Sequence, residues 1–361
     1  MLDDNSLFMK RMIPIRAFLL AISLLCSFNV AAQIRAVDAE SGLPVSYASV
    51  FDDATGKVVG ITSSDGLLPS AAGSCSKISL QHINYEPAAI AVNAIADHTI
   101  KLTPREAYSV NEVTVNKDKS DYVRLKWYVR RYTMINGVVS AVGETLYYGY
   151  YDEESKKLKK DLQLSQKLLR NESVFEGQKN MVTGLGSELL PFSNCVKVSS
   201  AITNFPKYKI GKRYHHYKGE NKLYTSFFRR DDKAQRLECV CDSGYVDKPF
   251  NLWLFGLSIS DVYRTVSFNS AYGKPGLSTL QNSTCSARLT HNKTKTAIDM
   301  YVEAYVLGVD YDTKAGLKAL EKQLAAKRKS GTMEPFVRPT GFPPFNKNVA
   351  EAMTHMTEVK E

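Results

Sequence analysis

The sequence lacks the short motifs that identify common hydrolases and metal enzymes. None of its six histidines belongs to an HExxH motif, one of the usual ligand arrangements of zinc peptidases. There is no GxSxG, the turn that presents the nucleophile of α/β-hydrolases. Residues 184–187 (GLGS) lack the spacing and the lysine of a phosphate-binding loop. We therefore predict a protein that is not an enzyme, with no catalytic residue, metal ligand or cofactor; a hydrolase with dispersed catalytic residues is a remote alternative.

Apolar runs long enough to cross a bilayer are also absent. The run Ala17–Phe28 is shorter than the about 20 apolar residues that a transmembrane helix needs. It follows the basic residues Lys10, Arg11 and Arg16 and is followed by Val-Ala-Ala-Gln at 30–33, a pattern typical of a secretory signal peptide. We predict that residues 1–32 are removed on export; a membrane anchor is the alternative. The mature chain is then expected in the periplasm or associated with the outer membrane, without a transmembrane span.

Charge of one sign is in excess, with 47 Lys and Arg against 37 Asp and Glu and a net charge of +10. A basic surface attracts polyanions, but nucleic acid is an improbable partner for an exported protein. The partners expected are envelope or outer-membrane proteins, or an anionic lipid or glycan. Solvated lysines without a specific partner explain the same balance.

One segment, Pro206–Lys218, interleaves basic and aromatic residues. Cations bind anionic groups and aromatic faces stack on sugars, so this composition favours an anion or glycan contact. An edge strand protected by lysines gives the same pattern. The candidate contact residues are Lys207, Lys209, Lys212, Arg213, Tyr214, His215 and Tyr217.

Five cysteines follow the predicted signal peptide, and their odd number leaves at least one thiol unpaired: Cys75, Cys195, Cys239, Cys241 and Cys285. The Cys-Val-Cys sequence at 239–241 has the composition of a metal or redox pair. Residues i and i+2 of a strand also share a face, so two small core residues give the same sequence. The pairing of these cysteines stays open.

Short alternating runs separated by turn residues occupy residues 34–102, the pattern of a small antiparallel sandwich. In this region Ile78 and Leu80 are predicted to share one face of a strand, and Ile100 and Leu102 one face of another strand. An Asp-Gly pair at 65–66 suits a tight turn because glycine readily adopts positive φ.

Residues 33–102 resemble the carboxypeptidase regulatory-like domain, a transthyretin-like β-sandwich of seven strands. The matching elements are Val37-Asp38 with Ser41-Gly42-Leu43-Pro44, Ala48-Ser49-Val50, Gly60-Ile61-Thr62 with Gly66, Ile78-Ser79-Leu80, Tyr85, and Ile100-Lys101-Leu102. The sequence departs from the family pattern at Ser63, Leu67 and Asn84, where the family has aspartate, an aromatic residue and glycine. The resemblance implies an accessory module of envelope proteins and transfers no catalytic residue.

The remaining chain is predicted to be mostly strand with a few helices. Tyr122–Met134 fits an amphipathic helix joining two domains. Residues 144–151 and 298–306 alternate as strands, the first with aromatics on both faces and the second with one buried face. Long antiparallel strands twist into a curved sheet or half-barrel, which can hold an apolar ligand. Helices are expected at 313–329 and 346–357, separated by a proline-rich segment.

These observations predict a mainly β fold with a bridging helix and C-terminal helices. The expected divisions are a signal peptide (1–32), a seven-stranded sandwich (33–117), the bridging helix (118–140), a curved antiparallel β domain (141–311) and a helical, proline-rich end (312–361). The leading hypothesis is an exported, non-catalytic envelope protein whose sandwich is a binding or assembly module. The alternative is a carrier that holds a lipid or glycan in the second β domain.

Overall fold

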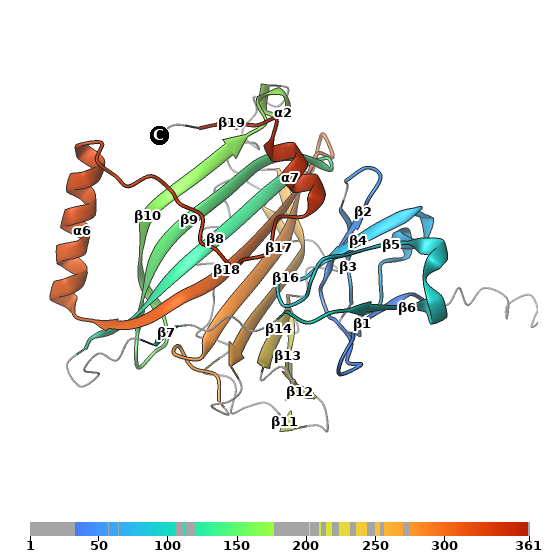
Figure 1. Cartoon of the computed structure of the whole chain (residues 1–361), viewed down its shortest axis with the longest axis horizontal. Helices are drawn as coiled ribbons and strands as arrows, with labels where there is room; N and C mark the ends of the chain where they lie inside the picture. The colour runs from blue at the N-terminus through green and yellow to red at the C-terminus, as the bar shows by residue number, and fades with distance from the viewer. Residues whose placement is uncertain are drawn as a thin grey trace, which may run out of the picture.

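The computed structural model describes residues 33–56, 58–63, 65–105, 111–112, 120–176, 202, 209–210, 214–218, 224–231, 236–243, 250–252, 256–269 and 274–359. The predicted signal peptide lies outside these ranges. The fold is mainly β, with a large antiparallel sheet and few helices, as the sequence predicts. Figure 1 shows a small N-terminal part in blue and cyan beside this large sheet.

The N-terminal part is a sandwich of two small sheets that face each other across an apolar core. One sheet pairs β1 (Arg35–Asp38) in parallel with β6 (Thr99–Leu102), and the other has the order β3-β2-β4-β5. The predicted inward residues Ile78, Leu80, Ile100 and Leu102 all lie in this core. The described residues contain six strands here, where the resemblance implies seven. The other elements are β2 (Ser49–Asp52), β3 (Val58–Ile61), η1 (Ser70–Ser74), β4 (Lys77–Gln81), β5 (Ala88–Ala91), η2 (Val92–Ala94) and η3 (Ala96–His98).

The large sheet is antiparallel except where the short β7 joins β18 in parallel. Its main path runs β11-β12-β13-β14-β16-β17-β18-β8-β9-β10-β19, and β15 pairs with β16. Its strands are β7 (Asn111–Glu112), β8 (Tyr122–Ile135), β9 (Val138–Asp152), β10 (Leu158–Arg170), β11 (Lys209–Ile210), β12 (Tyr214–Lys218), β13 (Tyr224–Asp231), β14 (Arg236–Ser243), β15 (Phe250–Leu252), β16 (Leu257–Asn269), β17 (Leu280–His291), β18 (Ala297–Asp312) and β19 (Thr357–Glu358).

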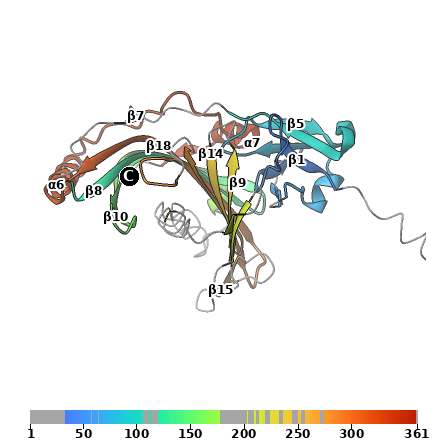
Figure 2. The same cartoon turned by 90° about the horizontal axis from the view of Figure 1, so that it is seen from below.

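The sheet is curved, and Figure 2 shows the sandwich and helix α7 (Lys347–Met353) on its outer, convex side. Because side chains alternate along a strand, each long strand presents one set of residues to each side. Leu125, Trp127 and Ala304 belong to a buried apolar cluster on the concave face, against which Ile202 packs. Tyr128, Arg130 and Glu303 face the convex side, and all three are buried.

The bridging helix predicted at 118–140 is wrong where the structure describes it, because residues 122–135 form strand β8. This strand lies in the middle of the sheet and pairs along its whole length with β18 and β9. Both of its faces are covered, so it does not alternate between apolar and polar residues, and its apolar positions resemble a helical period by chance. Its valine and aromatic content favours a strand.

Strand β18 corrects a second prediction, that of a single buried face. Ile298, Met300 and Val302 are buried as expected, but Tyr301, Glu303 and Tyr305 on the opposite face are buried as well. The hairpin predicted between residues 288–290 and the 298–306 strand is confirmed, with Leu289 paired to Ile298. Aromatics on both faces of residues 144–151 are likewise confirmed, since Tyr147 and Tyr150 pack in different clusters.

The two C-terminal helices are confirmed. Helix α6 (Lys314–Lys329) begins after Thr313, whose side chain accepts a hydrogen bond from the Gly316 amide, and buries Leu317 and Leu324. Helix α7 is shorter than predicted and is capped by Asn346. Residues 330–346, here called the strap, connect these helices along the convex face of the sheet (Figure 1). Helix α2 (Glu172–Glu176) follows β10.

Candidate functional site

The described part of the segment predicted as an anion or glycan contact lies at one end of the sheet. Lys209 is on β11, and Tyr214, His215 and Tyr217 are on β12, the first two strands of the sheet order. Lys207, Lys212 and Arg213 lie outside the described residues. The strand placement fits the edge-strand interpretation, and the proposed contact stays a prediction.

Three of the five cysteines have described side chains, namely Cys75, Cys239 and Cys285. Cys239 and Cys285 are buried in the concave apolar cluster, which explains half of the Cys-Val-Cys sequence as a core position. Cys195 and the side chain of Cys241 fall outside the described part of the chain. Within that part, no group of three or more His, Cys, Asp or Glu side chains is placed to hold a metal ion.

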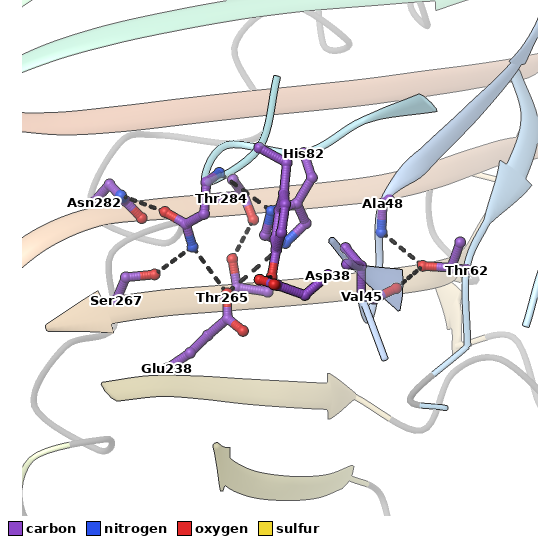
Figure 3. A network of polar contacts seen from close by, with 12 residues as sticks. Asp38, Val45, Ala48, Thr62, His82, Glu238, Thr265, Ser267, Asn282 and Thr284 are labelled. Carbon is purple, nitrogen blue, oxygen red and sulfur yellow. Dashed lines mark hydrogen bonds and ion pairs between the residues drawn. The ribbon is translucent and has the colours of Figure 1, made fainter. Parts of the chain in front are cut away.

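The described structure brings together a different set of residues, at the junction of the sandwich and the convex face, here called the seam. The loop after β4 inserts Asn84, which is nearly fully buried, against the large sheet. Its Nδ2 donates to Glu238 Oε1 and to Ser267 Oγ, both at 3.0 Å, and its Oδ1 accepts from Asn282 Nδ2 at 2.9 Å. Figure 3 shows the three partners of this amide, which lie on the neighbouring strands β14, β16 and β17: Glu238, Ser267 and Asn282.

His82, two residues earlier, adds to the same contact. Its Nδ1 accepts from the Asn84 amide at 3.2 Å, and its Nε2 lies 3.8 Å from Glu238 Oε1. Accepting at Nδ1 fits the neutral tautomer with its proton on Nε2, directed toward the carboxylate. The ring also packs edge-on against Tyr85, with the centroids 5.1 Å apart. His82 therefore fixes the loop that carries Asn84.

A second buried cluster in the seam centres on Glu303, of which only 1% is exposed. It accepts from Gln81 Nε2 at 3.0 Å, from the hydroxyls of Tyr301 and Tyr305 at 3.0 Å each, and from Arg130. Arg130 also donates to the carbonyl of Pro343 in the strap. One carboxylate thus joins the sandwich, the sheet and, through arginine, the C-terminal segment.

The strap is held by a further carboxylate, Glu144 on β9, which is 2% exposed. Arg338 of the strap makes two hydrogen bonds to it, Nε to Oε1 at 2.7 Å and Nη2 to Oε2 at 2.6 Å. Tyr128 donates to the same carboxylate. Such paired contacts are among the stronger and more directional ones in proteins.

These surroundings shift the protonation of Glu303 toward the charged form. Burial alone raises the pKa of Glu303, but the neighbouring Arg130 outweighs it and holds the pKa below its usual 4.5. Burial raises the pKa values of Tyr301 and Tyr305 well above 10.0, so both hydroxyls stay protonated donors. Glu303 therefore stays charged and accepts hydrogen bonds from four side chains. A general acid or base, by contrast, has a pKa near the pH at which the enzyme works.

Beside these clusters the seam opens into a cleft of about 260 Å³, here called the seam cleft. Its sandwich wall comes from Val59, Gly60 and Ile61 of β3 and from Pro69. Its sheet wall carries Ser286, Tyr301 and an ion pair in which Arg288 Nε donates to Asp299 Oδ1 at 2.6 Å. Arg288 and Asp299 are directly opposite on β17 and β18. An apolar wall facing a few fixed polar groups is typical of a small-ligand site.

Sequence reasoning found neither the seam nor its cleft. The only signal was Asn84, which departs from the glycine of the resembled family. An amide there is explained by its three partners on the large sheet, which lie 154 to 198 residues away in the chain.

The comparisons with known proteins leave the family open: no protein-family model matches the chain, and no curated protein matches it. In the part of the chain that the structure describes, none of the helices has the length and apolar character needed to cross a membrane.

Proposed function

We propose that this chain is an exported, non-catalytic protein of the cell envelope, and that its N-terminal sandwich, of the carboxypeptidase regulatory-like kind, is a binding module. The observation that supports this best is the seam. The sandwich is fixed to the sheet by buried hydrogen bonds, and a lined cleft opens where the two meet. Fixed walls favour binding because little conformational freedom is lost when a ligand enters.

The buried carboxylates of the seam and of the strap contact support binding over catalysis. Glu303, Glu144 and Glu238 each accept from donors on other elements. Carboxylates held in this way stabilise the interface and are poorly suited to proton transfer. A hydrolase with dispersed residues gains no support from these contacts.

The alternative function, a carrier with its ligand on the concave face, has less support. Leu125, Trp127 and Ala304 at the centre of that face are each 0% exposed, and Ile202 packs against their cluster. A carrier would need this core to open.

Native mass spectrometry of the full-length chain expressed with residues 1–32 and purified from envelope fractions tests the proposal. We expect a mature protein beginning at Gln33 that carries a bound small molecule or protein. Val59→Trp, which fills the seam cleft, should remove this adduct. Val337→Trp is the matched control, because Val337 is 72% exposed in the strap. An adduct of lipid mass that persists in Val59→Trp would favour the carrier, and a chain retained in the cytoplasm would overturn the proposal.

A further inference from the structure

The two walls of the seam cleft differ in chemistry. On the sandwich side, Val59, Ile61 and Pro69 present apolar groups that are only partly buried, so they are open to solvent in the cleft. On the sheet side, Ser286, Arg288 and Asp299 present a hydroxyl, a donor and an acceptor. A ligand that fits must carry an apolar face and a polar edge.

The ion pair restricts which ligand charge the cleft can favour. Arg288 and Asp299 neutralise each other across one strand pair, and their side chains are 37% and 18% exposed. The cleft therefore favours neither an anion nor a cation. Guanidinium donors beside carboxylate acceptors match a group that donates and accepts at once, which is the property of a hydroxyl.

The volume limits the ligand to about one ring. Pockets for drug-sized ligands usually span about 300 to 1,000 Å³, and this cleft is about 260 Å³. A pyranose has apolar C–H groups on its ring face and hydroxyls around its edge. The seam cleft has one apolar and one polar wall, an ion pair without net charge and a small volume. We therefore propose that it binds a neutral pyranose unit of a glycan. This inference rests on the proposed binding function and assigns its ligand.

Saturation-transfer NMR on the mature chain (33–361) with three probes tests the assignment. The probes are methyl β-D-glucopyranoside, D-glucuronic acid and the capped dipeptide N-acetyl-alanyl-leucinamide. We expect saturable binding of the neutral glucoside, with a dissociation constant on the order of 1 mM. Glucuronic acid should bind at least threefold more weakly, because among the described residues that line the cleft the one cation, Arg288, is paired with Asp299.

A paired replacement locates the binding. Arg288→Leu with Asp299→Leu removes the polar wall without leaving an unpaired charge and should weaken glucoside binding at least tenfold. The matched control is Lys327→Leu with Glu334→Leu, an exposed ion pair 3.1 Å apart on α6 and the strap, which should bind as the wild type does. Val59→Trp tests the same site from the apolar wall. If one of the two variants fails to fold, the other still tests the site.

The outcomes separate the ligand from the function. The sugar assignment is overturned if the wild type does not bind the glucoside. It is also overturned if Arg288→Leu/Asp299→Leu and Val59→Trp both bind the glucoside as tightly as the wild type does. Binding of the capped dipeptide alone, lost in Val59→Trp, also overturns it but leaves the binding module standing. If no probe binds and Val59→Trp changes no adduct in native mass spectrometry, both the sugar assignment and the binding function fail.

Discussion

Gly66 shows, at the scale of single residues, how the backbone of the sandwich limits substitution. Its φ is +74°, and a Cβ atom would lie 2.4 Å from the carbonyl oxygen of Ala36. Gly42 has a similar φ of +68°, but no described atom lies within 4 Å of such a Cβ. We expect Gly66→Ala to lower the free energy of unfolding by about 2–4 kcal/mol and Gly42→Ala by about 1 kcal/mol. Equal losses in urea denaturation would show that the clash is relieved by movement.

Asn84 allows a test of the seam by one substitution. Replacing it with alanine leaves Glu238, Ser267 and Asn282 without the amide that joins them. Unsatisfied buried groups cost about 1–3 kcal/mol, so Asn84→Ala should lower the free energy of unfolding by at least that much. Asn292→Ala, at an exposed turn position, should change it by less than about 0.5 kcal/mol. Similar denaturation curves for the two variants would mean that the seam contributes little to stability.

At the scale of elements, the strap is held to the sheet both by aromatic contacts and by polar contacts with buried partners. Arg338→Ala would leave Glu144 buried at 2% exposure with its strongest donor removed. We expect a loss of about 1–3 kcal/mol and faster amide hydrogen exchange in residues 330–346. Lys327→Ala is the control, because its partner Glu334 is 81% exposed and such surface pairs contribute about 0–1 kcal/mol. Unchanged exchange in Arg338→Ala would contradict the assigned role.

The elements also show what local sequence can specify. Helix α6 was predictable because an N-cap residue, Thr313, precedes leucines that recur with the period of a helix. Strand β8 was not predictable in this way. Its two faces meet different partners, the concave apolar cluster and the strap with its aromatic side chains, and both partners come from other parts of the chain. Recognising a strand from alternating apolar and polar residues requires that one of its faces meets solvent, and both faces of β8 are covered.

At the scale of the whole molecule, the convex face is covered by both ends of the described chain. The sandwich reaches Glu303 through Gln81, and the strap reaches the same cluster through Pro343 and Arg130. This explains why the seam could not be predicted. Glu303 reads as a solvent-facing residue on an alternating strand, and its burial depends on two segments that lie far from it in sequence. A mainly β fold follows from local propensity, whereas the site depends on the packing of these distant segments.

Because Glu303 connects these segments, acid should destabilise the whole molecule. Its pKa is held below 4.5 in the folded protein, and hydrogen bonds from the Ser41 and Glu40 amides and the Tyr85 hydroxyl outweigh burial to hold the pKa of Asp38 below 3.8. A lowered folded-state pKa contributes stability that is complete above the unfolded-state value and is lost as the pH falls through the folded-state value. We therefore expect the free energy of unfolding to fall progressively below about pH 4.5.

Glu303→Gln separates this contribution from general acid effects. At pH 7 it should be about 3–5 kcal/mol less stable than the wild type, because Arg130 is left buried without its counter-charge. As the pH falls below 4.5 this difference should shrink, because the wild type then loses the Glu303 charge as well. Asp38→Asn is the comparison at the sandwich, where only the contribution of Asp38 should disappear. Urea denaturation between pH 7 and pH 3 measures both variants, and a difference between wild type and Glu303→Gln that stays constant with pH would show that Glu303 is not charged in the folded protein.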